Sequence, residues 1–326
     1  MKKSSRDIFG KTVLVTGGAG FIGSHLVDHL IASGVAQVVV MDNMFLGSEK
    51  NLEKARLTGK LALYVDDAEL ATSLDYIFQR HKIDAVFNCA TKALNYSFIN
   101  PAHAFGTNVT VTLNLLELQR RGAYKTLCHF STSEVYGSAI YEPMDEQHPC
   151  KPTTTYAAGK AAADLAVESY VHMFGVDAFI VRPFNNYGPR QNYKGELAGV
   201  IPATAWRILT DCPPEIHGDG RQSRNFIYVR DTVDAVLKVF RVLPAGESVN
   251  ISTGNRFSIG DLVLLIAKTL GYRGEINRTP SRAADVFCHN ACNQKLRSLV
   301  DYADTDFVLG LTETLEWYAQ SWGRGK

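Results

Sequence analysis

A glycine-rich stretch, TGGAGFIGSHL at residues 16–26, limits what this chain can fold into more than any other feature. An apolar run at 13–15 precedes it, and an amphipathic helical pattern follows it as far as Ala32. The spacing of Gly17, Gly20 and Gly23 suits a turn whose backbone amides receive a pyrophosphate at a helix N-terminus. The motif alone would also fit an ordinary turn, but its place between strand and helix predicts a dinucleotide-binding unit.

The rest of the N-terminal half alternates between runs of strand length and helical patterns. The expected strands are QVVVM, LALYV, DAVFNCA, TLCHFS and AFIVRPF, and helices are expected over 22–32, over 70–80, up to about 118 and over about 156–174. Repeated strand and helix units imply a parallel sheet covered on both faces. We therefore predict an α/β fold with a doubly wound parallel sheet.

Charge and composition exclude several classes of function. The chain has 326 residues, and its 34 basic and 33 acidic residues leave a net charge of +1, too little for a broad field toward nucleic acid or an anionic membrane. No apolar stretch has the length of a signal peptide or a membrane span. The six cysteines are scattered, which favours free thiols and no metal site. A cytoplasmic protein is predicted.

An aspartate at the end of the second strand indicates the cofactor. Asp42 lies 19 residues beyond Gly23 (42 minus 23). A carboxylate at this position accepts hydrogen bonds from the ribose hydroxyls and repels a ribose phosphate, so NAD is predicted rather than NADP. Asp67 follows the third strand, where it could meet the adenine or simply be a solvated loop acid.

Tyr156 and Lys160 stand four residues apart at a predicted helix start, so their side chains share one face. A phenol, with a reference pKa of about 10, is a poor base at neutral pH. A neighbouring ammonium and a cationic nicotinamide would favour the phenolate. Behind a dinucleotide motif, the pair is predicted to take a proton from a hydroxyl while hydride leaves the same carbon; alone, it would fit an interfacial tyrosine and a solvated lysine.

Seven motifs together make the chain resemble the extended short-chain dehydrogenase/reductases that act on nucleotide sugars: TGGAGFIGSHL, DNMFLG, STSEVYG, YAAGK, RPFNNYGPR, GDGRQSRNFIYVRD and GLTETLEWY. The resemblance covers nearly the whole chain. It implies a Rossmann-type NAD-binding domain over residues 1–182, with a returning segment at about 225–252. A smaller, interleaved C-terminal lobe over 183–326 would mainly bind a nucleotide diphosphate sugar. The family resemblance, with apolar residues on more than one face of two helices, also predicts a homodimer.

The resemblance also implies individual roles. Tyr156 would be the base, Lys160 would hold the nicotinamide ribose, and Thr132 would bind the sugar hydroxyl that is oxidised. The implied cofactor contacts are Gly17, Gly20, Phe21, Ile22, Gly23, Asp42, Asn43, Asp67 and Lys160. The implied substrate contacts are Ser133, Asn185, Arg190, Arg224 and Arg282. The chain departs from the family at Asn225, where aspartate is usual, at Gly159, where serine is common, and at NCAT, residues 88–91.

Glu134, in STSEVYG, decides which reaction is predicted. Oxidation at C4 needs only Thr132, Tyr156 and NAD, whereas a 4-keto sugar has an acidified C5 hydrogen that a carboxylate can remove. The T-S-E triplet resembles the signature of sugar nucleotide 4,6-dehydratases. We therefore predict C5 proton abstraction by Glu134, loss of the C6 hydroxyl as water, and return of the hydride to C6.

Three alternatives stay open. UDP-glucuronate decarboxylases share T-S-E, and Ser133 stands where thymidine-type dehydratases have an aspartate, so the acid for water loss is unassigned. If Glu134 caps the adjacent turn or pairs with an arginine, the chain could be a 4-epimerase. An NAD-binding sensor or scaffold protein is disfavoured because Thr132, Tyr156 and Lys160 are all present.

Overall fold

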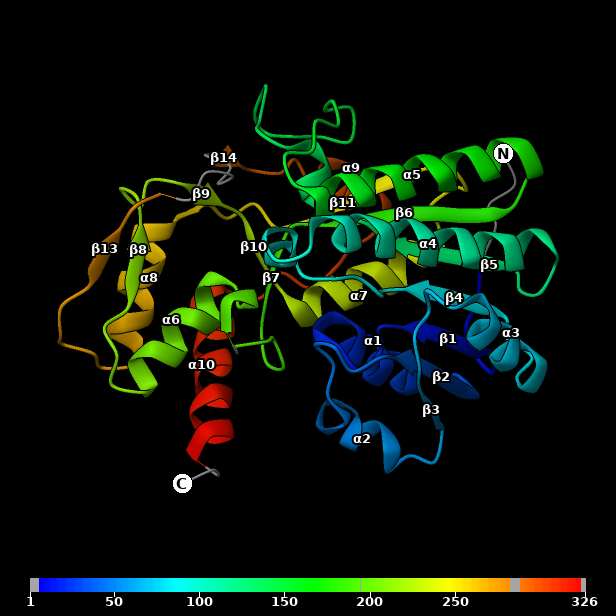
Figure 1. Cartoon of the computed structure of the whole chain (residues 1–326), viewed down its shortest axis with the longest axis horizontal. Helices are drawn as coiled ribbons and strands as arrows, with labels where there is room; N and C mark the ends of the chain where they lie inside the picture. Colours follow the sequence, from blue (N-terminus) through cyan, green and yellow to red (C-terminus); the bar gives the residue numbers. More distant parts are fainter. Residues whose placement is uncertain (1–5, 194, 282–287, 324–326) are drawn as a thin grey trace.

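The larger lobe is built on one seven-stranded sheet (Figure 1). The computed structural model describes residues 6–193, 195–281 and 288–323. The strand order is β11-β6-β5-β4-β1-β2-β3, and every neighbouring pair is parallel. The strands are β1 (Thr12–Thr16), β2 (Gln37–Asp42), β3 (Leu61–Val65), β4 (Ala85–Asn88), β5 (Thr126–Phe130), β6 (Asp177–Pro183) and β11 (Ser248–Ile251). The order reverses between β1 and β4, which opens a crevice at their carboxyl ends.

Helices cover both faces of this sheet, and alternate residues of each strand enter two different cores. Val13 and Val15 pack in the core beneath α1 and α7, whereas Leu14 packs in the core beneath α3, α4 and α5. The helices are α1 (Phe21–Ala32), α3 (Ala71–Arg80), α4 (Pro101–Arg120), α5 (Thr155–Phe174) and α7 (Val229–Phe240). The predicted doubly wound parallel sheet is confirmed. It could be predicted because strands that are buried on both faces consist of apolar runs, which can be recognised in the sequence.

The smaller lobe has its own apolar core and much shorter strands (Figure 1). Its helices are α6 (Val200–Leu209), α8 (Ile259–Thr269) and α10 (Phe307–Gly323). Its strands are β7 (Asn185–Tyr187), β8 (Glu215–His217), β9 (Ser223–Arg224), β10 (Phe226–Tyr228), β12 (Phe257–Ser258), β13 (Asn277–Thr279) and β14 (Cys288–His289). They form three small sheets, β10-β7, β12-β9-β14 and β13-β8.

The chain passes between the two lobes more than once. After β10, helix α7 and strand β11 lie on the large sheet, and α8 then returns to the small lobe. Leu296, in the short helix α9 (Gln294–Leu299), is buried in the core under α7. The remaining short elements are η1 (Glu49–Leu52), α2 (Glu53–Arg56), η2 (Leu94–Phe98), η3 (Ser133–Tyr136) and η4 (Gly195–Leu197). Over the described ranges, no helix combines the length and apolar character needed to cross a membrane.

Candidate active site

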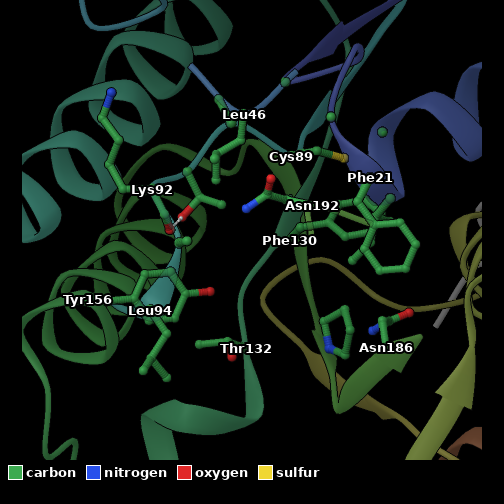
Figure 2. A pocket seen from close by; sticks show the side chains of 18 of the residues that line it. Phe21, Leu46, Cys89, Lys92, Leu94, Phe130, Thr132, Tyr156, Asn186 and Asn192 are labelled. Atoms are coloured by element: carbon green, nitrogen blue, oxygen red, sulfur yellow. Dashed lines mark hydrogen bonds between the residues drawn. The ribbon is translucent and has the colours of Figure 1, made fainter. Parts of the chain in front are cut away.

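A cavity of about 460 Å³ lies at the carboxyl end of the large sheet and extends to the small lobe (Figure 2). It is lined by segments that follow β1, β2, β4 and β5, by the start of α5, by β7 and by residues 191–201. Its volume suits a small-molecule site. Most of the predicted site residues meet here: Gly17, Gly20, Phe21, Ile22, Gly23, Asp42, Asn43, Asp67, Thr132, Ser133, Glu134, Tyr156, Lys160 and Asn185.

Two glycines shape the cofactor end of the cavity. A β-carbon on Gly23 would lie 2.2 Å from the Gly17 carbonyl oxygen, so the turn and the first turn of α1 touch backbone to backbone. Gly17 has a φ of +67° and lies against Ala90, whose nitrogen would be 2.8 Å from a β-carbon. The resulting cradle at the N-terminus of α1 fits the pyrophosphate of a dinucleotide.

Asp42 fastens the glycine turn to the end of β2. Its carboxylate accepts hydrogen bonds from the backbone amides of Ala19 and Met44, both at 2.9 Å. Burial raises the pKa of Asp42, the charge of Asp67 adds to the rise, and the backbone amides oppose it. Gly47 keeps side-chain bulk away from this carboxylate, since a β-carbon there would lie 2.6 Å from Oδ1. The Asp42 carboxylate is therefore placed where it fits ribose hydroxyls. Sequence reasoning missed the role of Gly47.

Tyr156 and Lys160 project from the first turns of α5, whose N-cap is Thr154. Figure 2 shows the Tyr156 hydroxyl pointing into the cavity near Thr132. The Lys160 ammonium donates a hydrogen bond of 2.7 Å to the Phe130 carbonyl. Burial raises the pKa of Tyr156 to about 12 and lowers the pKa of Lys160 to about 8. Burial is the largest cause of the raised pKa of Tyr156; hydrogen bonds with Thr132 and Thr91 oppose it, and the charge of Glu134 adds to it.

The T-S-E triplet begins the short helix η3, which gives Thr132 and Glu134 different positions. The Thr132 hydroxyl accepts a hydrogen bond of 3.2 Å from the Glu134 amide, so Thr132 is the residue that caps the turn. The Glu134 carboxylate is therefore left to line the cavity. Nδ1 of His289 lies 3.7 Å from Glu134 Oε1. Within the described residues, the Glu134 carboxylate neither caps the adjacent turn nor pairs with an arginine.

Some of the predicted substrate residues line the cavity and others do not. Asn185 lines the cavity and donates a hydrogen bond of 2.9 Å to the Asn225 carbonyl. Arg190 pairs with Asp28 on α1 at 2.8 Å and does not line the cavity. Arg224 also lies outside the lining and donates to the Ser223 carbonyl at 2.9 Å. Arg282 falls outside the described residues.

Sequence reasoning missed two polar residues that support Tyr156. Thr91 lines the cavity and donates a hydrogen bond of 2.7 Å to the Asn108 side-chain oxygen. The Asn108 amide donates in turn to the Tyr156 carbonyl at 3.3 Å. Thr91 could have been found from its place after the fourth strand, in NCAT. Asn108 lies inside a long helix and carries no such signal.

The structure accounts for two departures from the family pattern. A β-carbon on Gly159 would lie 2.5 Å from the Phe105 carbonyl oxygen, so the close packing of α4 on α5 leaves no room for serine. The Asn225 side chain accepts a hydrogen bond of 2.5 Å from the Ala291 amide and donates one to the Asn255 carbonyl. An aspartate could accept the first bond but could not donate the second.

Comparisons with known proteins agree with this geometry. A model described as the NAD dependent epimerase/dehydratase family matches residues 13–252. A UDP-glucose 4-epimerase of Mycolicibacterium smegmatis is 31% identical over 308 residues, covering 94% of this chain and 97% of that protein. The dTDP-D-glucose 4,6-dehydratase of Homo sapiens is 30% identical over 328 residues, covering 98% and 93%.

A solved structure has the same fold over nearly its whole length. The dTDP-glucose 4,6-dehydratase of Streptomyces venezuelae, determined with NAD bound, superposes with a TM-score of 0.90 at 28% identity, covering 96% of this chain and 98% of that one. Epimerases and dehydratases are thus similar to this chain to about the same degree. Overall similarity does not separate the two reactions, and the choice between them must come from the site.

Proposed function

Since this chain belongs to the NAD-dependent epimerase/dehydratase family, we propose that it is a nucleotide-sugar 4,6-dehydratase. The observation that carries the proposal is the Glu134 carboxylate, which lines the same cavity as Thr132 and Tyr156 while Thr132 performs the capping. A 4-epimerase needs no carboxylate at C5. A base beside the oxidised carbon is what elimination requires.

Each residue is given one task in this proposal. The Thr132 hydroxyl holds the C4 oxygen, and Tyr156 takes the C4 hydroxyl proton. Bound NAD would supply the hydride chemistry, with C4 as the donor carbon and C6 as the final acceptor. Glu134 removes the C5 proton of the 4-keto sugar, and the C6 hydroxyl leaves as water. Lys160, whose ammonium donates to the Phe130 carbonyl, would hold the nicotinamide ribose of bound NAD.

The decisive experiment is incubation with four nucleotide sugars: dTDP-glucose, UDP-glucose, UDP-N-acetylglucosamine and UDP-glucuronate. The proposal expects loss of water from at least one sugar, and in heavy water one solvent deuteron at C5 of the product. Loss of carbon dioxide from UDP-glucuronate would assign a decarboxylase instead. Unchanged mass with inversion at C4 would assign an epimerase.

Two substitutions separate the chemical steps. Glu134→Gln keeps the shape of the side chain and removes the base, so C4 oxidation should persist, with reduced nicotinamide accumulating, while water loss falls about 10²-fold. Tyr156→Phe should stop both steps, because no hydride leaves C4 without removal of the hydroxyl proton. If the two variants lose both steps equally, Glu134 is not a separate base.

The second candidate is a nucleotide-sugar 4-epimerase, which the UDP-glucose 4-epimerase of Mycolicibacterium smegmatis supports. An epimerase would return the hydride to C4 on the opposite face of the sugar. It predicts no deuterium at C5 and little loss of rate in Glu134→Gln. The same incubations therefore decide between the two candidates.

We also propose a homodimer formed through α4 and α5. These helices expose apolar side chains, among them Leu113 at 37%, Leu165 at 63% and Met173 at 67%. Light scattering of the unmodified chain should show a dimer at micromolar concentration. Leu165→Glu should shift it to monomer, whereas Leu309→Glu, on an equally exposed residue of α10, should not. A monomer before substitution would refute the proposal.

A further inference from the structure

One buried histidine near the catalytic carboxylate has no role in the reaction described so far. His289 belongs to β14, an edge strand of the small lobe that pairs with β9. Its side chain has no exposed surface. Glu134 and Ser133, 155 and 156 residues earlier (289 minus 134 and 289 minus 133), belong to the large lobe. The small lobe thus brings a titratable ring against the T-S-E triplet.

Hydrogen bonding fixes the tautomer of this ring. His289 Nε2 lies 3.0 Å from the Ser133 backbone carbonyl oxygen, which can only accept a hydrogen bond. Nε2 therefore carries the hydrogen, and in the neutral ring Nδ1 carries a lone pair. Nδ1 accepts a long hydrogen bond of 3.5 Å from the Ser133 hydroxyl and lies 3.7 Å from Glu134 Oε1. No hydrogen lies between His289 Nδ1 and the Glu134 carboxylate oxygen, because both atoms are acceptors.

The surroundings keep the ring neutral. Burial lowers the pKa of His289, and the charges of Arg224 and His148 act in the same direction. The charge of Glu134 and the Ser133 carbonyl oppose this fall. The Phe184 ring packs against the imidazole with centroids 5.3 Å apart, which holds the ring plane. The nitrogen that faces Glu134 is therefore an acceptor before the reaction begins.

We propose that His289 is the positioning residue of the Glu134 base, with Nδ1 as the hydrogen-bond acceptor for Glu134 once that carboxylate has taken a proton. This inference rests on the proposed function, because it assumes that Glu134 removes the C5 hydrogen. The hydrogen bond from protonated Glu134 to Nδ1 stabilises the product of proton transfer. His289 itself never touches the substrate.

Glu134 carries the C5 proton to the leaving C6 oxygen. The C5–H bond breaks and its proton moves to Glu134, while the electron pair forms the C5–C6 double bond and expels the C6 oxygen. Ser133 offers no acidic proton, so the proton held by Glu134 leaves with the C6 hydroxyl as water. The hydride then goes from C4 to C6, C5 takes one proton from solvent, and the C4 hydroxyl proton held by Tyr156 is released to solvent. Glu134 and His289 thus end in the states in which they began.

His289→Gln tests the contact with little change of shape. The glutamine amide nitrogen can still donate to the Ser133 carbonyl, but no acceptor remains at the Nδ1 position. Water loss should slow about 10-fold at unchanged KM, while C4 oxidation keeps its rate. Because His289 acts through Glu134, adding His289→Gln to Glu134→Gln should slow water loss no further. Additive losses, or equal losses in both steps, would overturn the inference and leave the proposed function standing.

An NMR measurement that needs no turnover tests the role of His289 separately from the proposed dehydratase function. ¹⁵N NMR of the NAD-loaded protein near pH 7 should show His289 neutral and protonated at Nε2. Glu134→Gln, which places an amide that can donate opposite Nδ1, should shift the Nδ1 resonance further upfield, toward the value of a more strongly hydrogen-bonded nitrogen. A ring protonated at Nδ1, or a resonance that ignores the substitution, would overturn the inference. If no sugar in the panel loses water, the proposed function fails, whatever the NMR result.

Discussion

The two ends of the cavity are held together by different kinds of interaction. At the cofactor end, loops leave adjacent strands of one continuous parallel sheet, and backbone lies directly against backbone, as at Gly17 and Gly23. At the substrate end, where β7 and the small lobe border the cavity, strands are two or three residues long and asparagine side chains connect the segments beside them. Asn185 bonds the Asn225 backbone, and Asn225 bonds both Asn255 and Ala291.

This difference indicates where each end is vulnerable. The cofactor end tolerates no added volume, because the atoms that would have to move belong to the main chain of the sheet and of α1. The substrate end depends on groups that both donate and accept, so it should be sensitive to chemistry at constant volume. Three substitutions test the contrast.

The largest effect is expected for Gly23→Ala at the cofactor end. The new β-carbon would lie 2.2 Å from the Gly17 carbonyl oxygen, so the glycine turn must shift away from the pyrophosphate site. NAD affinity, measured by titration calorimetry, should fall about 10²-fold, or about 3 kcal/mol. Gly106→Ala in α4, where a β-carbon meets nothing within 4 Å, is the matched control and should bind NAD normally. Equal affinities in the two variants would contradict the close-packing argument.

An intermediate effect is expected for Asn225→Asp at the substrate end, although aspartate is the residue that the family resemblance would favour. Asn225 is 3% exposed, and the substitution removes its hydrogen bond to Asn255 and leaves a carboxylate facing that carbonyl. The free energy of unfolding should fall by about 1–3 kcal/mol. Chemical denaturation measures the loss, and NAD binding should persist in the folded variant. A gain in stability would show that Asn225 does not act through its donor.

The smallest effect concerns cofactor choice. Asp42→Ala removes the carboxylate predicted to bind the ribose hydroxyls, so the preference for NAD over NADP should fall about 10-fold. Asp67→Ala removes a neighbouring charge from the same cavity but leaves the Asp42 carboxylate in place, and should change the preference less. Both preferences come from paired NAD and NADP titrations. If the unmodified chain binds the two cofactors equally, the argument for Asp42 fails.

The sequence predicted the cofactor end better than the substrate end for a physical reason. Gly17 to Gly23 and Asp42 are tied to strands whose apolar pattern is local, so spacing alone places them. His289 reaches Ser133 across 156 residues, and no local pattern records that contact. Asn108 likewise acts through Thr91 and the Tyr156 backbone, from inside a helix. The raised pKa of Tyr156 comes from burial, which depends on the packing of the whole cavity.

The repeated passage of the chain between the lobes makes the protein hard to divide. A fragment that ends after β6 would lack β11 at the edge of the sheet and α7 over one of its cores. A graft of the small lobe from a relative would have to exchange several separate segments and rejoin each one to the sheet. New specificity should therefore arise more readily by point substitution around the cavity than by recombination of whole modules.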